Sequence, residues 1–470
     1  MGNYFVVFCF LLISIILMWV IPKLVKADRK SRLLVYYIIF AECFGIMPRA
    51  LNVITGFDEV IGPNSIYYIP KTEDSIKALW LIILFNFSFL CGYLFVILQV
   101  KAISRRRKIQ LENNVTKLQP FEQFNHNEIK SVSKLLILIS IPGVLFIIQS
   151  IFNSGTMLTN SDIEGTRIDV SGMGPLIFLK EIPLTALLVW FSLRSGKVGA
   201  YWWIFLASLI SISLLAGVRS TMVTAAVMIL SIYLLHNGYK SLKKKAFLLG
   251  FGGIIVFYLG WITFFARGNL LKFGGDYWFW VKKAILTNPI DAFLIISRGS
   301  FNGFDGLVNI VKYVPEQFSY HYGRFWYESS TIIIPRAIWH DKWDLPFTNL
   351  YTNAVFGWSK GGIFVTGPGV LYLDSGLIGV LLGAFMIGAI STLSLVVLSQ
   401  ILRNHQWIKY YCFACCAFFM LRFTFAGGSN DAGIIQRLII ESFIILIVVK
   451  LNLEFNRSRK YRLTSITKGN

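Results

Sequence analysis

Long runs of apolar residues constrain this chain more than any other feature of its sequence. Residues 4–22, 78–100 and 376–400 are clear examples, and each matches the length of a helix that crosses a bilayer, which needs about 20 residues. A shorter predicted span lies at 410–421. Hydrophobic residues make up 55% of the 470 positions, more than ordinary soluble proteins carry. Together the runs predict an all-α polytopic membrane protein with about eleven transmembrane helices.

The placement of Lys and Arg predicts the orientation of these helices. The chain has 45 Lys and Arg against 24 Asp and Glu, a formal net charge of +21. Short loops rich in Lys and Arg stay on the cytoplasmic side of a membrane. Such loops occur at residues 23–32 and 101–134, and the C-terminal tail is also basic. The pattern places the N-terminus outside and the C-terminus inside. Because topology explains the positive charge, nucleic acid is not expected as a partner.

The same reasoning divides the chain into three parts. Residues 1–266 are expected to hold the first eight transmembrane helices. Residues 267–375 are too polar, and too rich in Gly, Pro, Trp and Tyr, to form spanning helices, so we expect a large loop domain outside the membrane. Residues 376–470 are expected to hold the last three helices and the basic tail. Within the loop domain, residues 285–297 are apolar enough to form an amphipathic helix at the membrane interface.

Several arginines, Arg49 among them, lie at the predicted outer ends of helices, against the positive-inside trend. One explanation is a lipid diphosphate ligand, because a guanidinium group binds phosphate oxygens in a bidentate manner. The other is that these side chains reach lipid headgroups or pair with carboxylates. Arg219 lies in an almost loopless turn between two predicted helices, and it favours the first explanation most clearly.

Aromatic and charged residues alternate in the outer domain, at residues 321–328 and 334–342. Trp and Tyr rings stack on sugars, while charged and imidazole side chains bind hydroxyl groups. An interfacial aromatic belt would explain the Trp and Tyr residues but not the ionisable ones. The composition therefore favours a carbohydrate ligand. The side chains expected to contact a glycan are Tyr322, Arg324, Trp326, Trp339, Asp341 and Lys342.

Asp374 lies directly before the apolar run 376–400, where a carboxylate is costly. Two interpretations stay open: it caps a helix N-terminus, or it is a functional carboxylate that faces an outer cavity.

No cofactor and no metal are expected. The sequence has no Gly-rich nucleotide-binding loop, no His and Cys spacing typical of metal ligands and no nucleophile elbow. All six cysteines lie in apolar runs, where packing explains them.

The motifs in their order resemble those of the oligosaccharide repeat-unit polymerases, the Wzy-type polymerases of O-antigens and capsules. The resemblance rests on the Gly-x-Arg-Ser turn at 217–220, on Tyr322-Gly323 followed by Pro335-Arg336, and on Gly367-Pro368-Gly369 followed by Asp374-Ser375-Gly376. Two positions depart from the pattern: His340 stands where Pro is expected after Trp339, and Asp374 stands where Glu is also usual.

The resemblance implies a membrane-embedded glycosyltransferase of the bacterial cytoplasmic membrane whose active site faces the periplasm or exterior. Its substrates would be polyprenyl-diphosphate-linked oligosaccharides, as donor and as acceptor. The growing glycan would pass from its lipid diphosphate to the non-reducing end of a new repeat unit, without a metal and with inversion. A flippase and a chain-length regulator of the same pathway would be its partners in the lipid bilayer.

The resemblance also suggests roles for individual residues. The groups that would hold the diphosphate are Arg219 and Arg336, followed by Arg167 and Arg298. The groups that would orient or deprotonate the acceptor hydroxyl are Glu328, His321 and Asp374.

Two other functions share many of these features. An O-antigen-ligase-type enzyme would pass the finished glycan to a different acceptor. A flippase or other transporter would need a charged cavity within the bilayer and usually repeated halves, and no half-repeat is visible here.

Overall fold

The computed structural model describes residues 2–54, 72–111, 137–145, 182–193, 220–238, 277–288, 303–331, 347–356, 365–401 and 406–427, with single positions elsewhere. These residues are almost entirely helical. They belong to two compact units, and each unit is described by itself. Unit 1 comprises Met1–Thr116, Phe264–Ile401 and Cys415–Gln436, and unit 2 comprises Lys117–Thr263, Leu402–Ala414 and Arg437–Asn470.

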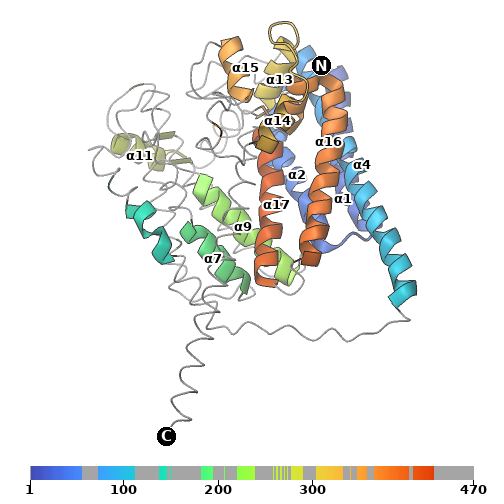
Figure 1. The fold of residues 1–470 in the computed structure, drawn as a ribbon. Helices are drawn as coiled ribbons and strands as arrows, with labels where there is room; N and C mark the ends of the chain where they lie inside the picture. The colour runs from blue at the N-terminus through green and yellow to red at the C-terminus, as the bar shows by residue number, and fades with distance from the viewer. Residues whose placement is uncertain are drawn as a thin grey trace. The chain divides into compact units, whose positions relative to one another are not determined.

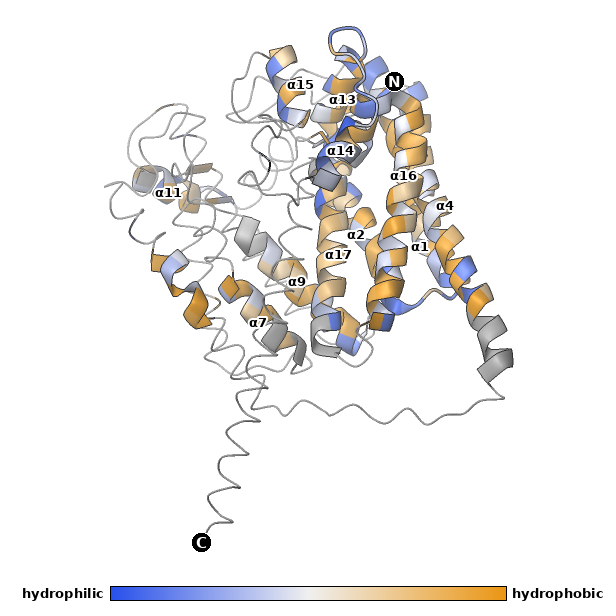
Figure 2. Ribbon diagram, viewed as in Figure 1, coloured by the Kyte–Doolittle hydropathy of each residue, from blue (hydrophilic) through white to orange (hydrophobic). Residues whose placement is uncertain are grey.

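Three helices of unit 1 are long and apolar enough to cross a membrane: α1 (Gly2–Leu24), the stretch Glu73–Ile103 of α4 (Thr72–Leu111), and α16 (Gly367–Ile401). They coincide with predicted spans at 4–22, 78–100 and 376–400. Figure 2 shows these helices mostly in hydrophobic colours. The chain is therefore an all-α membrane protein, while the total of about eleven spans and the orientation stay predictions.

Helices α1, α2 (Arg29–Gly45), α4 and α16 pack side by side in unit 1 (Figure 1). The closest approach is between α4 and α16. A Cβ atom on Gly92 would strike the carbonyl oxygen of Phe385, and one on Gly388 would strike that of Phe89. Backbone contact through small residues is how helices associate where the surroundings are as apolar as the side chains.

Buried polar side chains also join the helices of unit 1. The Nδ2 amide of Asn86 in α4 donates to Ser14 Oγ in α1 at 3.1 Å and to Glu42 Oε2 in α2 at 3.0 Å. All three residues are at most 2% exposed. A buried polar group is costly unless it is hydrogen-bonded, so this network specifies how the three helices fit together.

A second buried connection links α3 (Met47–Ile54) to α13 (Gly303–Tyr313). Arg49 Nε lies 3.0 Å from both carboxylate oxygens of Asp305, and each side chain is 1% exposed. Of the two explanations for the outer arginines, pairing with a carboxylate therefore applies to Arg49. It also fastens a helix of the predicted outer domain to the N-terminal part of the chain.

The described helices of the predicted outer domain are short. They are α11 (Tyr277–Leu286), α13, α14 (Arg324–Thr331) and α15 (Phe347–Phe356). The long helix α16 starts inside this domain and is interrupted at Ser375 and Gly376. Gly376 has φ +63°, a left-handed conformation that glycine adopts at little cost. The segment before the break lies against the first turns after it, because Leu371 contacts Gly383.

Unit 2 contains α7 (Ile182–Leu193), α9 (Ser220–Asn237) and the first part of α17 (Gln406–Ala426). Tyr411 donates a hydrogen bond to Thr185 at 3.4 Å, and the rings of His236 and Tyr410 lie 4.1 Å apart. Helix α17 is longer than the predicted span at 410–421, because the helix continues past Arg422 to Ala426. The second half of α17 belongs to unit 1, where Phe423 lies against Phe85.

Candidate functional site

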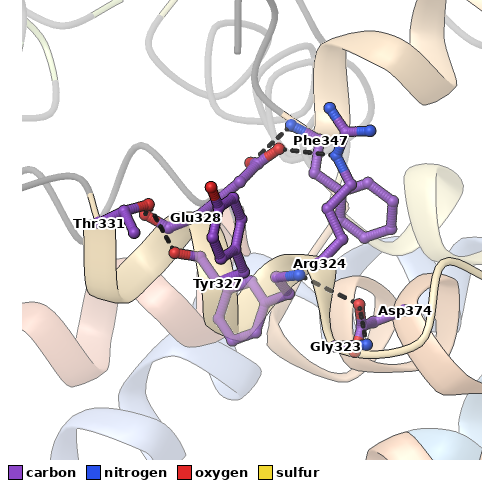
Figure 3. Close-up of polar contacts among 8 residues, drawn as sticks. Gly323, Arg324, Tyr327, Glu328, Thr331, Phe347 and Asp374 are labelled. Carbon is purple, nitrogen blue, oxygen red and sulfur yellow. Dashed lines mark hydrogen bonds and ion pairs between the residues drawn. The ribbon is translucent and has the colours of Figure 1, made fainter. Parts of the chain in front are cut away.

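Two segments that carry the family resemblance are in direct contact (Figure 3). The carboxylate of Asp374, just before the break in α16, accepts hydrogen bonds from the backbone of the turn that precedes α14. The Gly323 N–H lies 3.1 and 3.0 Å from its two oxygens, and the Phe325 N–H lies 3.0 Å from Oδ1. Residues about fifty positions apart in sequence therefore form one local structure.

Asp374 acts as the N-terminal cap of α14. The first N–H groups of a helix have no partner within the helix, and a carboxylate satisfies them and interacts favourably with the helix dipole. Ser375 Oγ donates a further bond to Oδ2 at 3.0 Å, and Asp374 is 1% exposed. The carbonyl oxygen of Asp374 also accepts from His321 and Tyr322. Of the two interpretations of Asp374, the structure favours capping, although of α14 rather than of its own helix.

Glu328 has a similar role at the start of the next helix, α15. Its Oε2 accepts the backbone N–H of Phe347, the first residue of α15, at 2.8 Å. Its Oε1 accepts from Arg324 Nε at 2.9 Å, and the carboxylate is 1% exposed. Figure 3 shows Glu328 between these two donors. The position of Glu328 thus orients the Arg324 guanidinium and connects α14 to α15.

His321 is the most accessible of the three residues with a predicted acid–base role. Its ring lies 4.9 Å from that of Phe318 and 5.5 Å from that of Phe347. Burial and the Arg324 guanidinium lower the pKa of His321, while Asp374 and Glu328 oppose this shift. A neutral imidazole can accept a proton, which neither carboxylate can do without giving up hydrogen bonds that hold α14 or α15.

Aromatic side chains surround this turn. Tyr322 is 77% exposed although its backbone has φ +29°, a conformation uncommon for residues other than glycine. Tyr320 lies between Tyr322 and Tyr372, with ring centroids 6.0 Å from each. Tyr327 is half exposed and lies 6.1 Å from Trp339. A strained turn that holds a tyrosine ring in solvent is typical of a binding surface.

Two other predicted glycan contacts are described. Trp326 packs edge to face against Phe325, with ring centroids 5.3 Å apart. Arg324 exposes 30% of its side chain beside Glu328. The remaining predicted site residues lie outside the described residues: Arg167, Arg219, Arg298, Arg336, Asp341 and Lys342.

The described charges at this turn do not form an anion site by themselves. One guanidinium, that of Arg324, is paired with the carboxylate of Glu328, and Asp374 adds a second acidic group at the same turn. A diphosphate would need additional cations to bind here. The described part of the site is better suited to neutral sugar hydroxyls than to phosphate. Within the described ranges, no group of three or more His, Cys, Asp or Glu could hold a metal ion.

Two groups of buried polar residues are absent from the predictions above. Asp305 stands next to an apolar segment, and an acidic residue in that position is a signal for a buried pair. Glu42 and Asn86 lie in predicted spans, where any polar side chain indicates a helix contact or a site. Their mutual contact could not be read from local sequence, because it depends on how α2 and α4 pack.

Comparison of the chain with protein-family models, with curated proteins and with solved structures finds no match.

Proposed function

We propose that this chain is a glycosyltransferase that polymerises polyprenyl-diphosphate-linked oligosaccharide repeat units on the outer face of a bacterial cytoplasmic membrane. The product would be a surface polysaccharide such as an O-antigen or a capsule. The observation that carries the proposal is the set of hydrogen bonds from Gly323 and Phe325 to Asp374. Two of the three motifs behind the family resemblance thereby meet at one exposed, aromatic turn next to a membrane-spanning helix.

The reaction is a transfer at the anomeric carbon of the growing glycan. The bond from this carbon to the lipid diphosphate breaks, and a bond to a hydroxyl oxygen of the new repeat unit forms on the opposite face. The electron pair of the broken bond leaves with the diphosphate, whose charge the arginines at 219 and 336, with 167 and 298 as second choices, would stabilise. The proton of the acceptor hydroxyl must go to a base.

We assign the proton acceptor to His321 rather than to the two carboxylates. The lowered pKa of His321 keeps its ring neutral near pH 7. Asp374 and Glu328 would serve as positioning residues, because their oxygens already accept backbone N–H groups. Tyr322 would stack on a sugar ring of the acceptor, and Trp339 would extend this surface beside Tyr327.

The glycan produced in cells tests the proposal. Surface and lipid-linked glycans are compared on gels from cells that lack the gene and from the same cells with the gene on a plasmid. A ladder that collapses to one repeat unit without the gene supports the polymerase. Long polymer retained on the carrier lipid would indicate an O-antigen-ligase-type enzyme instead. Single units trapped on the inner leaflet would indicate a flippase, and an unchanged pattern would refute all three.

Variants of the turn test the role of His321. His321→Ala should abolish the ladder while the protein inserts and melts normally. Tyr322→Ala should shorten the polymer or raise the substrate concentration that is needed, whereas Tyr322→Phe should keep the stacking surface and retain activity. Ser330→Ala, at an exposed position of α14, is the matched control. A His321→Ala variant that still makes full-length polymer would rule out this residue as the base.

A further inference from the structure

Helix α11 exposes large apolar side chains that a helix in water would hide. It runs from Tyr277 to Leu286 and ends where the predicted amphipathic segment at 285–297 begins. The exposed fractions are 49% for Trp278, 56% for Phe279, 51% for Ile285 and 85% for Leu286. Ala284, by contrast, is fully buried, so one edge of the helix faces the protein. The other side is a surface on which apolar side chains are about half exposed or more.

Two lysines lie on the same exposed side. Lys282 is one helical turn from both Trp278 and Leu286, so it stands in a row between two apolar residues. Lys283 is the corresponding neighbour of Phe279, and its ammonium lies 5.2 Å from the centroid of the Trp280 ring. Long cationic side chains among apolar ones can keep their stems in an apolar layer while their charges reach a polar one. This arrangement fits a boundary between hydrocarbon and anionic groups.

The length of α11 and its surroundings identify that boundary. Ten residues of helix cover about 15 Å, half of the hydrocarbon thickness of a bilayer, so α11 cannot span it. Unit 1 also contains the three helices that are long and apolar enough to cross a membrane, so a bilayer is adjacent to the same unit. An exposed face of Trp, Phe and Leu with two lysines is typical of helices that lie in the headgroup region.

We propose that α11 lies along the membrane interface and binds anionic phospholipid. Trp278, Phe279, Ile285 and Leu286 enter the region between headgroups and acyl chains. Lys282 and Lys283 contact lipid phosphates, because cations near an anionic membrane surface are attracted to it. This inference concerns the bilayer and does not depend on the proposed glycosyltransferase activity.

Photo-crosslinking in membranes tests the placement of α11. A benzophenone amino acid replaces Phe279 or Leu286 in the full chain, which is reconstituted in vesicles that contain phosphatidylglycerol. Illumination followed by mass spectrometry should identify lipid adducts at both positions. The same amino acid at the position of Leu382, which is 61% exposed in α16, is the positive control for contact with lipid. The same amino acid at the exposed position of Gln317, between α13 and α14, is the negative control for a site in water.

The expected yield of lipid adduct at 279 and 286 is several-fold above that at 317 and close to that at 382. Yields equal to the water control would overturn the proposal, and so would adducts with another protein in native membranes. Charge-reversal variants test the contact between the two lysines and lipid phosphates. The double change K282E and K283E should reduce phosphatidylglycerol adducts several-fold, whereas K282R and K283R should preserve them. Equal yields with and without the anionic lipid would overturn the assignment of the two lysines.

Discussion

Replacing Asp374 by Asn should destabilise the protein before it affects any chemistry. The carboxylate accepts bonds from the N–H groups of Gly323 and Phe325 and from Ser375 Oγ, at 3.0 to 3.1 Å. An asparagine has one acceptor oxygen, so at least one donor would meet an NH₂ group instead. Hydrogen bonds to a charged group contribute about 1.5–3 kcal/mol each, and loss of the charge weakens those that remain.

We therefore expect Asp374→Asn to lower the free energy of unfolding by about 2 kcal/mol. For a large domain this corresponds to a fall of roughly 4–8 °C in the melting temperature. Ser375→Ala is the matched control, since it removes one of the same hydrogen bonds but keeps the Asp374 carboxylate that caps α14. Ser375 is only partly buried, so water can replace its hydroxyl, and the change should cost about 1 kcal/mol or less.

The assay combines stability and activity. The apparent melting temperature is measured in detergent by fluorescence-detected size-exclusion chromatography, and the glycan ladder is measured in complemented cells. If Asp374 acts mainly as a helix cap, the melting temperature and the amount of polymer should fall together in the Asp374→Asn variant. Cells grown at lower temperature should then recover part of the ladder. An Asp374→Asn protein that melts like the wild type but makes no polymer would refute capping as the main role and return Asp374 to the chemistry.

Two substitutions test other regions of the molecule, and a change of pH tests His321. Arg49→Met should lower the free energy of unfolding by about 3–5 kcal/mol, because it leaves the buried Asp305 carboxylate without its cationic partner. The double variant with Asp305→Leu should recover much of this loss in the same melting assay. Gly388→Leu should prevent folded protein from accumulating, because a side chain there collides with the backbone of α4. Ile390→Leu, at a half-exposed position of the same helix, should be tolerated. The amount of monomer recovered after size exclusion measures the effect of each variant. Burial lowers the pKa of His321, so the stability that its neutral ring contributes is present above about pH 6.5 and is lost as the pH falls below this value. Polymer formation should likewise stay constant from pH 8 to 6.5 and drop only at lower pH. Pulse-labelling of glycan in spheroplasts measures this pH dependence.

The long helices could be predicted from the sequence because their signal is local. Twenty consecutive apolar residues are sufficient to indicate a spanning helix. Helix α1 follows the run at 4–22 closely, and the part of α16 after its break follows the run at 376–400, although α16 itself begins at Gly367. The predicted end of the span at 421 is wrong, because α17 continues past Arg422 to Ala426. One long cationic side chain near a helix end can reach the interface, so it does not stop the helix.

The contacts that build the candidate site could be predicted only to a limited extent. The sequence placed His321, Glu328 and Asp374 in one outer domain and grouped them by the chemistry that they share. It could not show which backbone N–H groups the carboxylates meet, because these partners come from other helices. Asp374 caps α14 from α16, and Glu328 reaches Phe347 at the start of α15. Local patterns give a capping residue only when it precedes its own helix.

The cap of α15 by Glu328 depends on the cap of α14 by Asp374, and the latter depends on the position of α16. The break in α16 places Asp374, Asp374 holds the start of α14, and Glu328 on α14 holds the start of α15. His321 and Tyr322 lie in the turn that precedes α14, and their backbone N–H groups donate hydrogen bonds to the carbonyl oxygen of Asp374. Any change that loosens the first cap therefore displaces the imidazole and the exposed tyrosine, although it removes no group that touches a ligand. For this reason, loss of polymer in an Asp374 variant that is also destabilised does not identify a catalytic base, whereas loss of polymer in a His321 variant of normal stability would.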